Sequence, residues 1–275
     1  MIIKILLLFS LSLSAKESFI DVITTNDLHG FLGEQDAYFM NPNFPPKILG
    51  ASALYKYIKD IEAELPNQSD DILIFDGGNF FQGHPIGIID SGKTVIKWMN
   101  KVGYDAIVPG SNDFLFGYEN LLSLSNIANF PFLSCNIKYE DTNELLFKPY
   151  EIINIKGLKV GVLGLSNSDI EETVLEKNIK GIKIESSIDS MDFWVSKLID
   201  NVDIIILLTS SGVPWDRDEV YQDFSNLTDS ERLIKKHLNA IELGYYADNI
   251  DVIISGGENI SSIEIENTLA KHPSV

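Results

Sequence analysis

Residues 19–30 read Phe-Ile-Asp-Val-Ile-Thr-Thr-Asn-Asp-Leu-His-Gly, and the rest of the chain is best understood from this stretch outward. Its β-branched first half gives way to polar residues and a glycine, the pattern of a strand that ends in a loop. Asp27 and His29 are two residues apart, so in an extended segment both side chains would point to the same side. A carboxylate and an imidazole held together can bind a metal ion. The structural alternative is an Asx-turn closed by Asp27 beside an incidental histidine.

Strand and helix patterns alternate along the chain. Apolar residues at helical spacing predict helices over residues 51–65, 94–102, 118–128, 191–201 and 228–243. Short apolar runs predict strands over residues 72–75, 106–108, 132–135, 204–208 and 252–254, with a hairpin joining 150–155 to 159–165. This alternation indicates an α/β fold with largely parallel strands. The polar loops at the strand ends then meet on one face, which is the candidate site.

Composition restricts the classes of function. The chain has 275 residues, of which 45% are apolar, so it can build a substantial core. The formal net charge of −19, from 40 acidic and 21 basic residues, argues against a nucleic-acid partner, because binding a phosphate backbone requires a basic face. The single cysteine, Cys135, excludes an internal disulfide and is expected to be a buried structural thiol.

The first fifteen residues resemble a secretory signal peptide. Lys4 supplies the positive start, residues 5–13 form an apolar stretch, and Ser14 and Ala15 offer small residues for cleavage. No later stretch has the roughly 18 consecutive apolar residues of a membrane span. We therefore expect an exported protein, periplasmic or secreted, with no membrane span.

Taken in order, the strand-end loops resemble those of the 5′-nucleotidase branch of the calcineurin-like metallophosphoesterases. Residues 25–30 (Thr-Asn-Asp-Leu-His-Gly) are similar to the family's first block, which carries an aspartate and a histidine ligand. Residues 76–83 (Asp-Gly-Gly-Asn-Phe-Phe-Gln-Gly) resemble its second block, and residues 96–117 the run that includes its Gly-Asn-His-Glu block. The resemblance extends over residues 19–259. It implies an α/β four-layer αββα sandwich of two mixed sheets flanked by helices.

The resemblance also implies a reaction, the metal-dependent hydrolysis of nucleotide phosphate esters. In the family two divalent ions bridged by a carboxylate bind the phosphate and generate hydroxide, and a histidine beside them neutralises developing charge. Most of the residues that this chemistry uses are replaced in this chain. The replaced positions are Asn79 (bridging aspartate), Ser111 (asparagine ligand), Asn112 (catalytic histidine), Leu115 (its supporting aspartate), and Ser210, Gly257 and Asn259 (histidine ligands).

Only Asp27 and His29 match the family's ligands, and we expect them to form a mutually hydrogen-bonded pair. The chain has four histidines, too few for the family's centre. Of these, His237 falls in the predicted helix 228–243 and His272 near the end of the chain. The possible compensating ligands are His84, Asp76 and Asp113, although the two aspartates also suit a structural role as hydrogen-bond acceptors within loops.

Two hypotheses follow. In the first, the chain is a non-catalytic binding or scaffold relative without a cofactor, because an amide at position 79 cannot supply the charge that holds two dications together. In the second, it is an active phosphoesterase whose rebuilt centre holds a single Mn, Zn, Co, Mg or Ca ion and acts on a nucleotide or another phosphate ester. The sequence indicates no particular protein partner.

The sequence also predicts a domain organisation. We expect residues 16–275 to form one metallophosphoesterase-like domain that is incomplete at its C-terminal end and lacks the family's C-terminal nucleotide-binding domain. Either the sequence is a fragment or the protein retains only the first domain.

Overall fold

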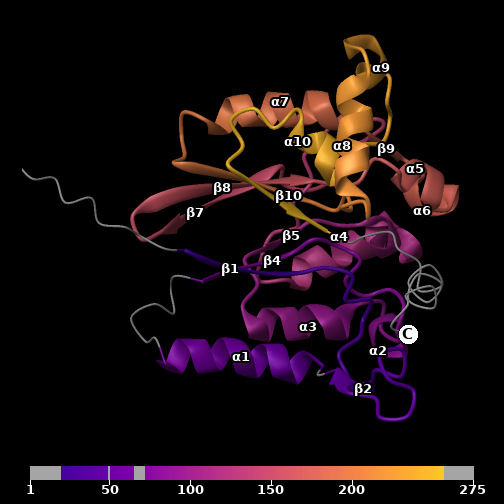
Figure 1. Cartoon of the computed structure of the whole chain (residues 1–275), viewed down its shortest axis with the longest axis vertical. Helices are drawn as coiled ribbons and strands as arrows, with labels where there is room; N and C mark the ends of the chain where they lie inside the picture. Colours follow the sequence, from indigo (N-terminus) through magenta and orange to yellow (C-terminus); the bar gives the residue numbers. More distant parts are fainter. Residues whose placement is uncertain (1–19, 49, 65–71, 257–275) are drawn as a thin grey trace, which may run out of the picture.

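The structure, a computed structural model, describes residues 20–48, 50–64 and 72–256 (Figure 1). Two sheets lie face to face, and helices cover their outer faces. Helices α1 (Ala51–Glu64) and α3 (Lys93–Val102) cover one sheet, and α7 (Ser187–Leu198) covers the other (Figure 1). The expected α/β class and the helix–sheet–sheet–helix order are confirmed.

The two sheets differ in strand direction. The first has the order β1-β4-β5, built from Asp21–Thr25, Ile72–Asp76 and Ala106–Ile107, and all its pairs are parallel. The second has the order β11-β10-β8-β7, built from Val252–Ser255, Ile204–Thr209, Leu158–Leu165 and Tyr150–Ile155. Here β7 runs antiparallel to β8 as the predicted hairpin. Among the described strands, therefore, only the second of the two main sheets is mixed.

Alternating side chains divide the core into layers. In β4, Leu73 and Phe75 belong to the cluster between the sheets, whereas Ile74 belongs to the cluster beneath the helices of the first sheet. In β10, Ile206 and Leu208 likewise face the other sheet. Because successive side chains of a strand point to opposite faces, each central strand contributes to two apolar layers. This explains why these strands are apolar throughout.

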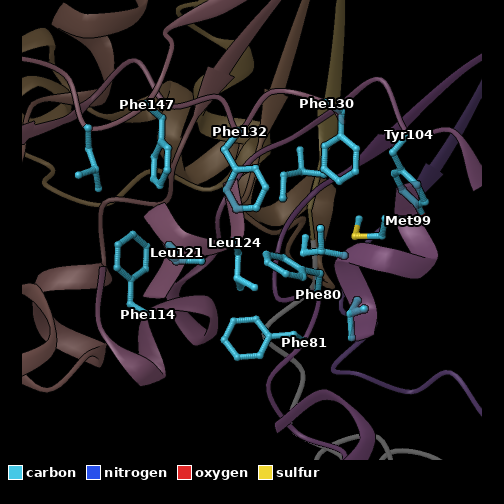
Figure 2. Packing of buried hydrophobic residues seen from close by; sticks show 14 of the residues in the cluster. Phe80, Phe81, Met99, Tyr104, Phe114, Leu121, Leu124, Phe130, Phe132 and Phe147 are labelled. Atoms are coloured by element: carbon cyan, nitrogen blue, oxygen red, sulfur yellow. The ribbon is translucent and has the colours of Figure 1, made fainter. Parts of the chain in front are cut away.

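The cluster between the first sheet and its helices also supports the candidate site (Figure 2). Phe80, Phe81 and Phe114 are fully buried in it. The ring centroids of Phe80 and Phe81 are 5.2 Å apart, and those of Phe80 and Phe132 are 5.9 Å apart. Phe80 directly follows Asn79 in the chain and Phe114 follows Asp113, so this aromatic packing fixes the backbone of both loops.

The predicted helix over residues 228–243 is wrong. Helix α9 (Asp229–Leu233) ends early, residues 235–239 form no regular secondary structure, and α10 (Ala240–Gly244) then begins. Asn239 starts the new helix, because its side-chain oxygen accepts hydrogen bonds from the backbone N–H groups of Ile241 and Glu242. His237 therefore lies on an irregular segment between two helices rather than on a helix.

The remaining elements are short. The predicted strand 132–135 is reduced to isolated bridges, whereas α4 (Tyr118–Ile127) matches its prediction and α8 (Arg217–Asn226) was not predicted. The others are β2 (Gln35–Asp36), β3 (Lys47–Ile48), α2 (Pro85–Ile88), η2 (Ser111–Phe116), β6 (Ile137–Tyr139), α5 (Ile170–Thr173), α6 (Glu176–Ile179) and β9 (Ile182–Ile184). Within the described ranges, no helix combines the length and apolar character needed to cross a membrane.

Candidate functional site

The carboxyl ends of the two sheets meet at one place. The loop after β4 touches the loop after β11, because a Cβ added to Gly77 would lie 2.4 Å from the Cα of Gly256. The loop after β5 is joined to the loop after β8 by a 2.7 Å hydrogen bond from the Ser111 hydroxyl to Asp169. The loops therefore gather on one face, as the alternating pattern predicted.

The Asp27 loop is not extended. Asp27 and His29 have φ values of 48° and 47°, in the left-handed region, so the expectation of an extended segment is wrong. Two backbone hydrogen bonds hold the loop in this conformation, from the Asp27 N–H to the Gly78 carbonyl (3.0 Å) and from the His29 N–H to the Asn79 carbonyl (2.9 Å). The loops after β1 and β4 thus form one paired unit at the site.

Asn79 occupies the centre of this unit. Its Nδ2 donates a 2.8 Å hydrogen bond to Oδ1 of Asp27, and its Oδ1 accepts a 3.1 Å hydrogen bond from the backbone N–H of Asn112. Both ends of the amide are therefore paired. The geometry joins Asp27 to Asn79, not to His29.

His29 is bonded elsewhere. Its Nδ1 lies 2.7 Å from the backbone carbonyl of Gln82, and because a carbonyl only accepts, Nδ1 carries the proton. Its Nε2 lies 3.8 Å from Oδ1 of Asp27, which is too far for a hydrogen bond. The expected hydrogen-bonded pair of Asp27 and His29 is therefore wrong. With Nδ1 protonated, neutral His29 presents the lone pair of Nε2 to the site.

Asp113 is a buried support for the Asn79 loop. Its side chain is fully buried and accepts hydrogen bonds from the backbone N–H groups of Asn79 (2.7 Å), Phe80 (2.9 Å) and Gly110 (2.9 Å). Burial raises the pKa of this carboxyl to about 7, against the lowering effect of these hydrogen bonds. Asp113 thus binds backbone in this structure.

Asp76 has a similar position at the end of β4. It is fully buried and accepts hydrogen bonds from the Thr25 hydroxyl (2.6 Å) and the Gly78 N–H (2.9 Å). Burial raises the pKa of Asp76 to about 8. The Thr25 hydroxyl also contacts the Tyr104 hydroxyl at 2.8 Å, so a small polar network closes this end of the strand.

His84 and Leu115 have structural environments. The Nδ1 of His84 accepts a 3.3 Å hydrogen bond from the Ile86 N–H and caps α2, while its ring packs against Phe31 with centroids 4.4 Å apart. Its backbone N–H donates to the His29 carbonyl at 2.7 Å, so the two histidines are neighbours. Leu115, at the position of the family's supporting aspartate, is 43% exposed near the end of η2. An aspartate here would therefore not be buried beside Asn112.

The loop of residues 166–169, which was not predicted to belong to the site, forms hydrogen bonds with the hydroxyls of Ser111 and Ser210. The N–H of Asn167 donates a 2.8 Å hydrogen bond to the Ser210 hydroxyl, and Asp169 accepts from Ser111. Ser111 and Ser210 stand where the resemblance places metal ligands, so one loop pairs both positions. The available signal was the polar run Ser-Asn-Ser-Asp directly after an apolar strand. Gly257 and Asn259 lie outside the described residues.

The described residues do not fit the dinuclear centre that the resemblance implies. In ranges 20–48, 50–64 and 72–256, no three His, Cys, Asp or Glu side chains are grouped so that they could hold a metal ion. Asp27 and His29 together offer one oxygen and one nitrogen ligand, whereas catalytic zinc sites usually have three protein ligands. At position 79, where the pair of ions would need a bridging carboxylate, an amide donates a hydrogen bond to Asp27.

Sequence comparison identifies relatives. No protein-family model matches the chain. The chain is 29% identical to a 5′-nucleotidase of Vibrio cholerae over 194 residues, covering 70% of this chain and 33% of that protein. It is also 29% identical to the rat 5′-nucleotidase over 211 residues, covering 74% of this chain and 36% of that protein. The chain thus spans about a third of the length of the curated relatives it matches.

Solved structures agree on the fold. A calcineurin-like phosphoesterase from Bacillus subtilis superposes with a TM-score of 0.64 at 23% identity, covering 89% of this chain and 74% of that one. A 5′-nucleotidase precursor from Thermus thermophilus gives a TM-score of 0.66 at 20% identity, covering 86% of this chain and 41% of that one. In sequence the chain is therefore similar to 5′-nucleotidases, and its fold is that of a calcineurin-like phosphoesterase.

Proposed function

We propose that this chain is an exported, non-catalytic relative of the 5′-nucleotidases, in which the former metal site is closed by hydrogen bonds and the domain serves in binding or as a scaffold. The observation that carries the proposal is the 2.8 Å hydrogen bond from Nδ2 of Asn79 to Oδ1 of Asp27. It supports a site that is stable without a cation.

Charge explains why this bond matters. An aspartate at position 79 would place a second carboxylate against Asp27, and two carboxylates at that distance repel unless a cation or a proton lies between them. Asparagine converts that repulsion into an attraction between a donor and an acceptor. The same substitution removes the bridging charge that two dications require. One residue change thus favours the metal-free state and disfavours the metal-bound state.

The neighbouring positions support the same conclusion. Ser111 donates to Asp169 and Ser210 accepts from Asn167, so both hydroxyls have protein partners. Neither position supplies the imidazole or amide ligand that the family uses there. Asn112 likewise has no imidazole to neutralise charge on a phosphate, and removing one such electrostatic stabiliser typically costs about 10²–10³ in rate.

The other features of the proposal rest on sequence. Residues 1–15, the expected signal peptide, and the ends of the proposed domain 16–275 lie outside the described residues. The net charge of −19 argues against nucleic acid as the partner. Nucleotides remain the substrate class to test, because the curated relatives are named 5′-nucleotidases.

The test combines metal content with turnover. We expect the purified chain to retain far less than one metal ion per molecule after dialysis. We also expect no hydrolysis of AMP or of a nitrophenyl phosphate above background with added Mn, Zn, Co, Mg or Ca. Asp27→Ala should leave these results unchanged. Asp36→Ala, at an exposed aspartate that pairs with Lys47, is the matched control for a lost surface carboxylate.

One observation favours the second candidate, a phosphoesterase with a single metal ion. His29 presents the lone pair of Nε2 at 3.8 Å from Oδ1 of Asp27, so the two groups could share one cation with waters as the remaining ligands. Hydrolysis that requires a divalent ion, and that is lost in both Asp27→Ala and His29→Ala but retained in Asp36→Ala, would establish this candidate and overturn the first.

A further inference from the structure

The irregular segment 235–239, between α9 and α10, lies beside the candidate site and is bound to the 166–169 loop. The Ser168 hydroxyl lies 3.1 Å from the backbone carbonyl of Lys236 and 3.1 Å from Nδ1 of His237. A hydroxyl has one proton, and the carbonyl can only accept, so that proton goes to Lys236. Nδ1 of His237 must therefore be the donor in its contact with Ser168.

The other ring nitrogen of His237 faces a carboxylate. Its Nε2 lies 2.9 Å from Oε1 of Glu172 on α5, within ion-pair distance, and this buried atom makes no hydrogen bond of good geometry with any described residue. A nitrogen lone pair directed at a carboxylate oxygen is repulsive, whereas an N–H directed at it is attractive. Since Nδ1 already carries a proton, an attractive contact with Glu172 requires the doubly protonated imidazolium.

The charged groups around this ring belong to two elements. Helix α5 contributes Glu171 and Glu172, and the segment itself contributes Lys236, whose Nζ lies 3.3 Å from Glu171 and 3.4 Å from Glu172. The hydrogen bond and charge of His237 hold the pKa of Glu172 below its ordinary value. Two carboxylates thus face two cations when His237 is protonated, and one cation when it is not.

These contacts connect to the candidate site through the chain itself. Ser168 lies between Asn167, which binds Ser210, and Asp169, which binds Ser111. At its other end the segment leads into α10, where the Ala240 N–H donates to the Gly212 carbonyl at 2.9 Å. Any separation of the segment from the 166–169 loop therefore removes support from two loops that form the site.

We propose that residues 235–239 are a pH-sensitive latch, closed on the 166–169 loop when His237 carries two protons and released when it loses one. The direction follows from linkage. The Glu172 carboxylate attracts the imidazolium form of His237 and not the neutral ring, so the latch is favoured at lower pH and weakened as the pH rises. Glu172 must be ionised, so the latch also weakens in strong acid, below the lowered pKa of that group. Leu238, which is buried, anchors the segment, so the opening is local.

Hydrogen exchange measured by mass spectrometry between pH 5.5 and 8.5 tests the latch, after correction for the intrinsic effect of pH on exchange. We expect the amides of residues 234–237 to exchange faster, relative to their intrinsic rates, at the higher pH. His237→Gln should be open at both pH values, and Glu172→Gln should lose most of the pH dependence. Protection that is independent of pH in the wild-type chain would overturn the proposal.

Glu185→Gln is the matched control, because Glu185 pairs with Lys183 at 2.7 Å, and this contact holds the pKa of Glu185 below its ordinary value. It should leave the latch unchanged. If His237→Gln does not fold, an NMR titration of the wild-type chain replaces it: the ring signals of His237 and the amides of the segment should shift with the same midpoint, and unrelated midpoints would overturn the latch. Neither readout involves metal or turnover, so the latch can fail while the proposed function stands, and the reverse.

Discussion

Two sets of ionisable side chains lie on the same face of the molecule and behave differently. Asp76 and Asp113 are fully buried and bind backbone or hydroxyl donors. Asp27 and His29, by contrast, keep side-chain exposures of 27% and 38%. The buried carboxylates hold the loop backbone in place, and that requirement exists with or without a metal. Asp27 and His29 are more accessible to solvent, so their surroundings can change while the buried carboxylates hold the loops in place.

The buried carboxylates explain why the loops at this face hold a defined conformation. The left-handed conformations of Asp27, His29 and Asn79 are unfavourable for residues with a Cβ, and such strain persists only where surrounding contacts impose it. Those contacts are the backbone hydrogen bonds between the loops and the bonds to Asp113. The backbone hydrogen bonds between the loops and the bonds to Asp113 therefore hold these strained conformations. The exposed side chains of Asp27 and His29 do not determine them.

The largest effect should come from Asp113→Ala. The substitution leaves the backbone N–H groups of Asn79, Phe80 and Gly110 without their acceptor in a buried loop, so we expect a loss of about 4 kcal/mol in the free energy of unfolding. Urea unfolding, followed by circular dichroism, measures it. Asp27→Ala should cost about 1 kcal/mol. Equal losses for the two variants would mean that the buried carboxylate of Asp113 stabilises the fold no more than the partly exposed carboxylate of Asp27 does.

Asp76 should make the stability of the chain depend on pH. Its pKa is raised to about 8 by burial, so between pH 4 and 8 the folded chain holds a proton that the unfolded chain releases. Stability due to this group is therefore greatest below pH 4, falls as the pH rises and levels off above about 8. Asp76→Asn should remove this loss and be more stable than the wild-type chain at pH 9, on the order of 3 kcal/mol, with little difference at pH 4.

Asparagine suits this position because the Thr25 and Tyr104 hydroxyls are 2.8 Å apart and can reverse the direction of their hydrogen bond. Thr25 can then accept from the new amide, and Gly78 keeps its acceptor. Thermal unfolding of both proteins across the pH range provides the measurement. A constant difference between them would show that folding does not change the pKa of Asp76, contrary to the raised pKa.

Periodicity predicted the elements that local patterns determine. The 150–155 and 159–165 hairpin, the helix from residue 51 and the strand-end loops all follow from alternation and turn residues within a few positions. The helix over 228–243 failed because tertiary contacts of His237 with Ser168 and Glu172 overrode its helical spacing. Spacing cannot reveal such a partner, which lies more than sixty residues away.

The sequence predicted which loops lie close together, but not the contacts that their side chains make. Strand-end logic brought Asp27, Asn79, Ser111 and Ser210 to one face. It gave the wrong partner for Asp27, because the two-residue spacing to His29 assumes an extended backbone and the actual φ is 48°. The roles of Asn167 and Asp169 were missed, since a polar loop after a strand is common and only the fold shows which hydroxyls it meets.

Asn79→Asp tests whether the contact between Asn79 and Asp27 is adapted to the absence of a cation. A second carboxylate beside Asp27 should lower the free energy of unfolding by about 2 kcal/mol at pH 7 and low salt. The loss should shrink at pH 4, where one carboxyl is protonated. Thermal unfolding with and without millimolar Mn²⁺ supplies the second arm. Asn79→Gln, which changes size without charge, is the control, and its loss should not depend on pH.

The smallest effects should come from the two hydroxyls that the 166–169 loop binds. Ser210→Ala leaves the Asn167 N–H without its acceptor, and Ser111→Ala leaves Asp169 without its 2.7 Å donor, so each should cost about 1 kcal/mol in chemical unfolding. Ser210→Thr and Ser111→Thr keep the hydroxyl and should cost less than their alanine counterparts. If the loop joins the two sheets as one unit, the double alanine variant should lose more than the sum of the single losses, whereas simple additivity would mean that each bond acts alone. Non-additivity would show that Ser111 and Ser210, like the buried carboxylates Asp76 and Asp113, help to hold the loop backbone in place.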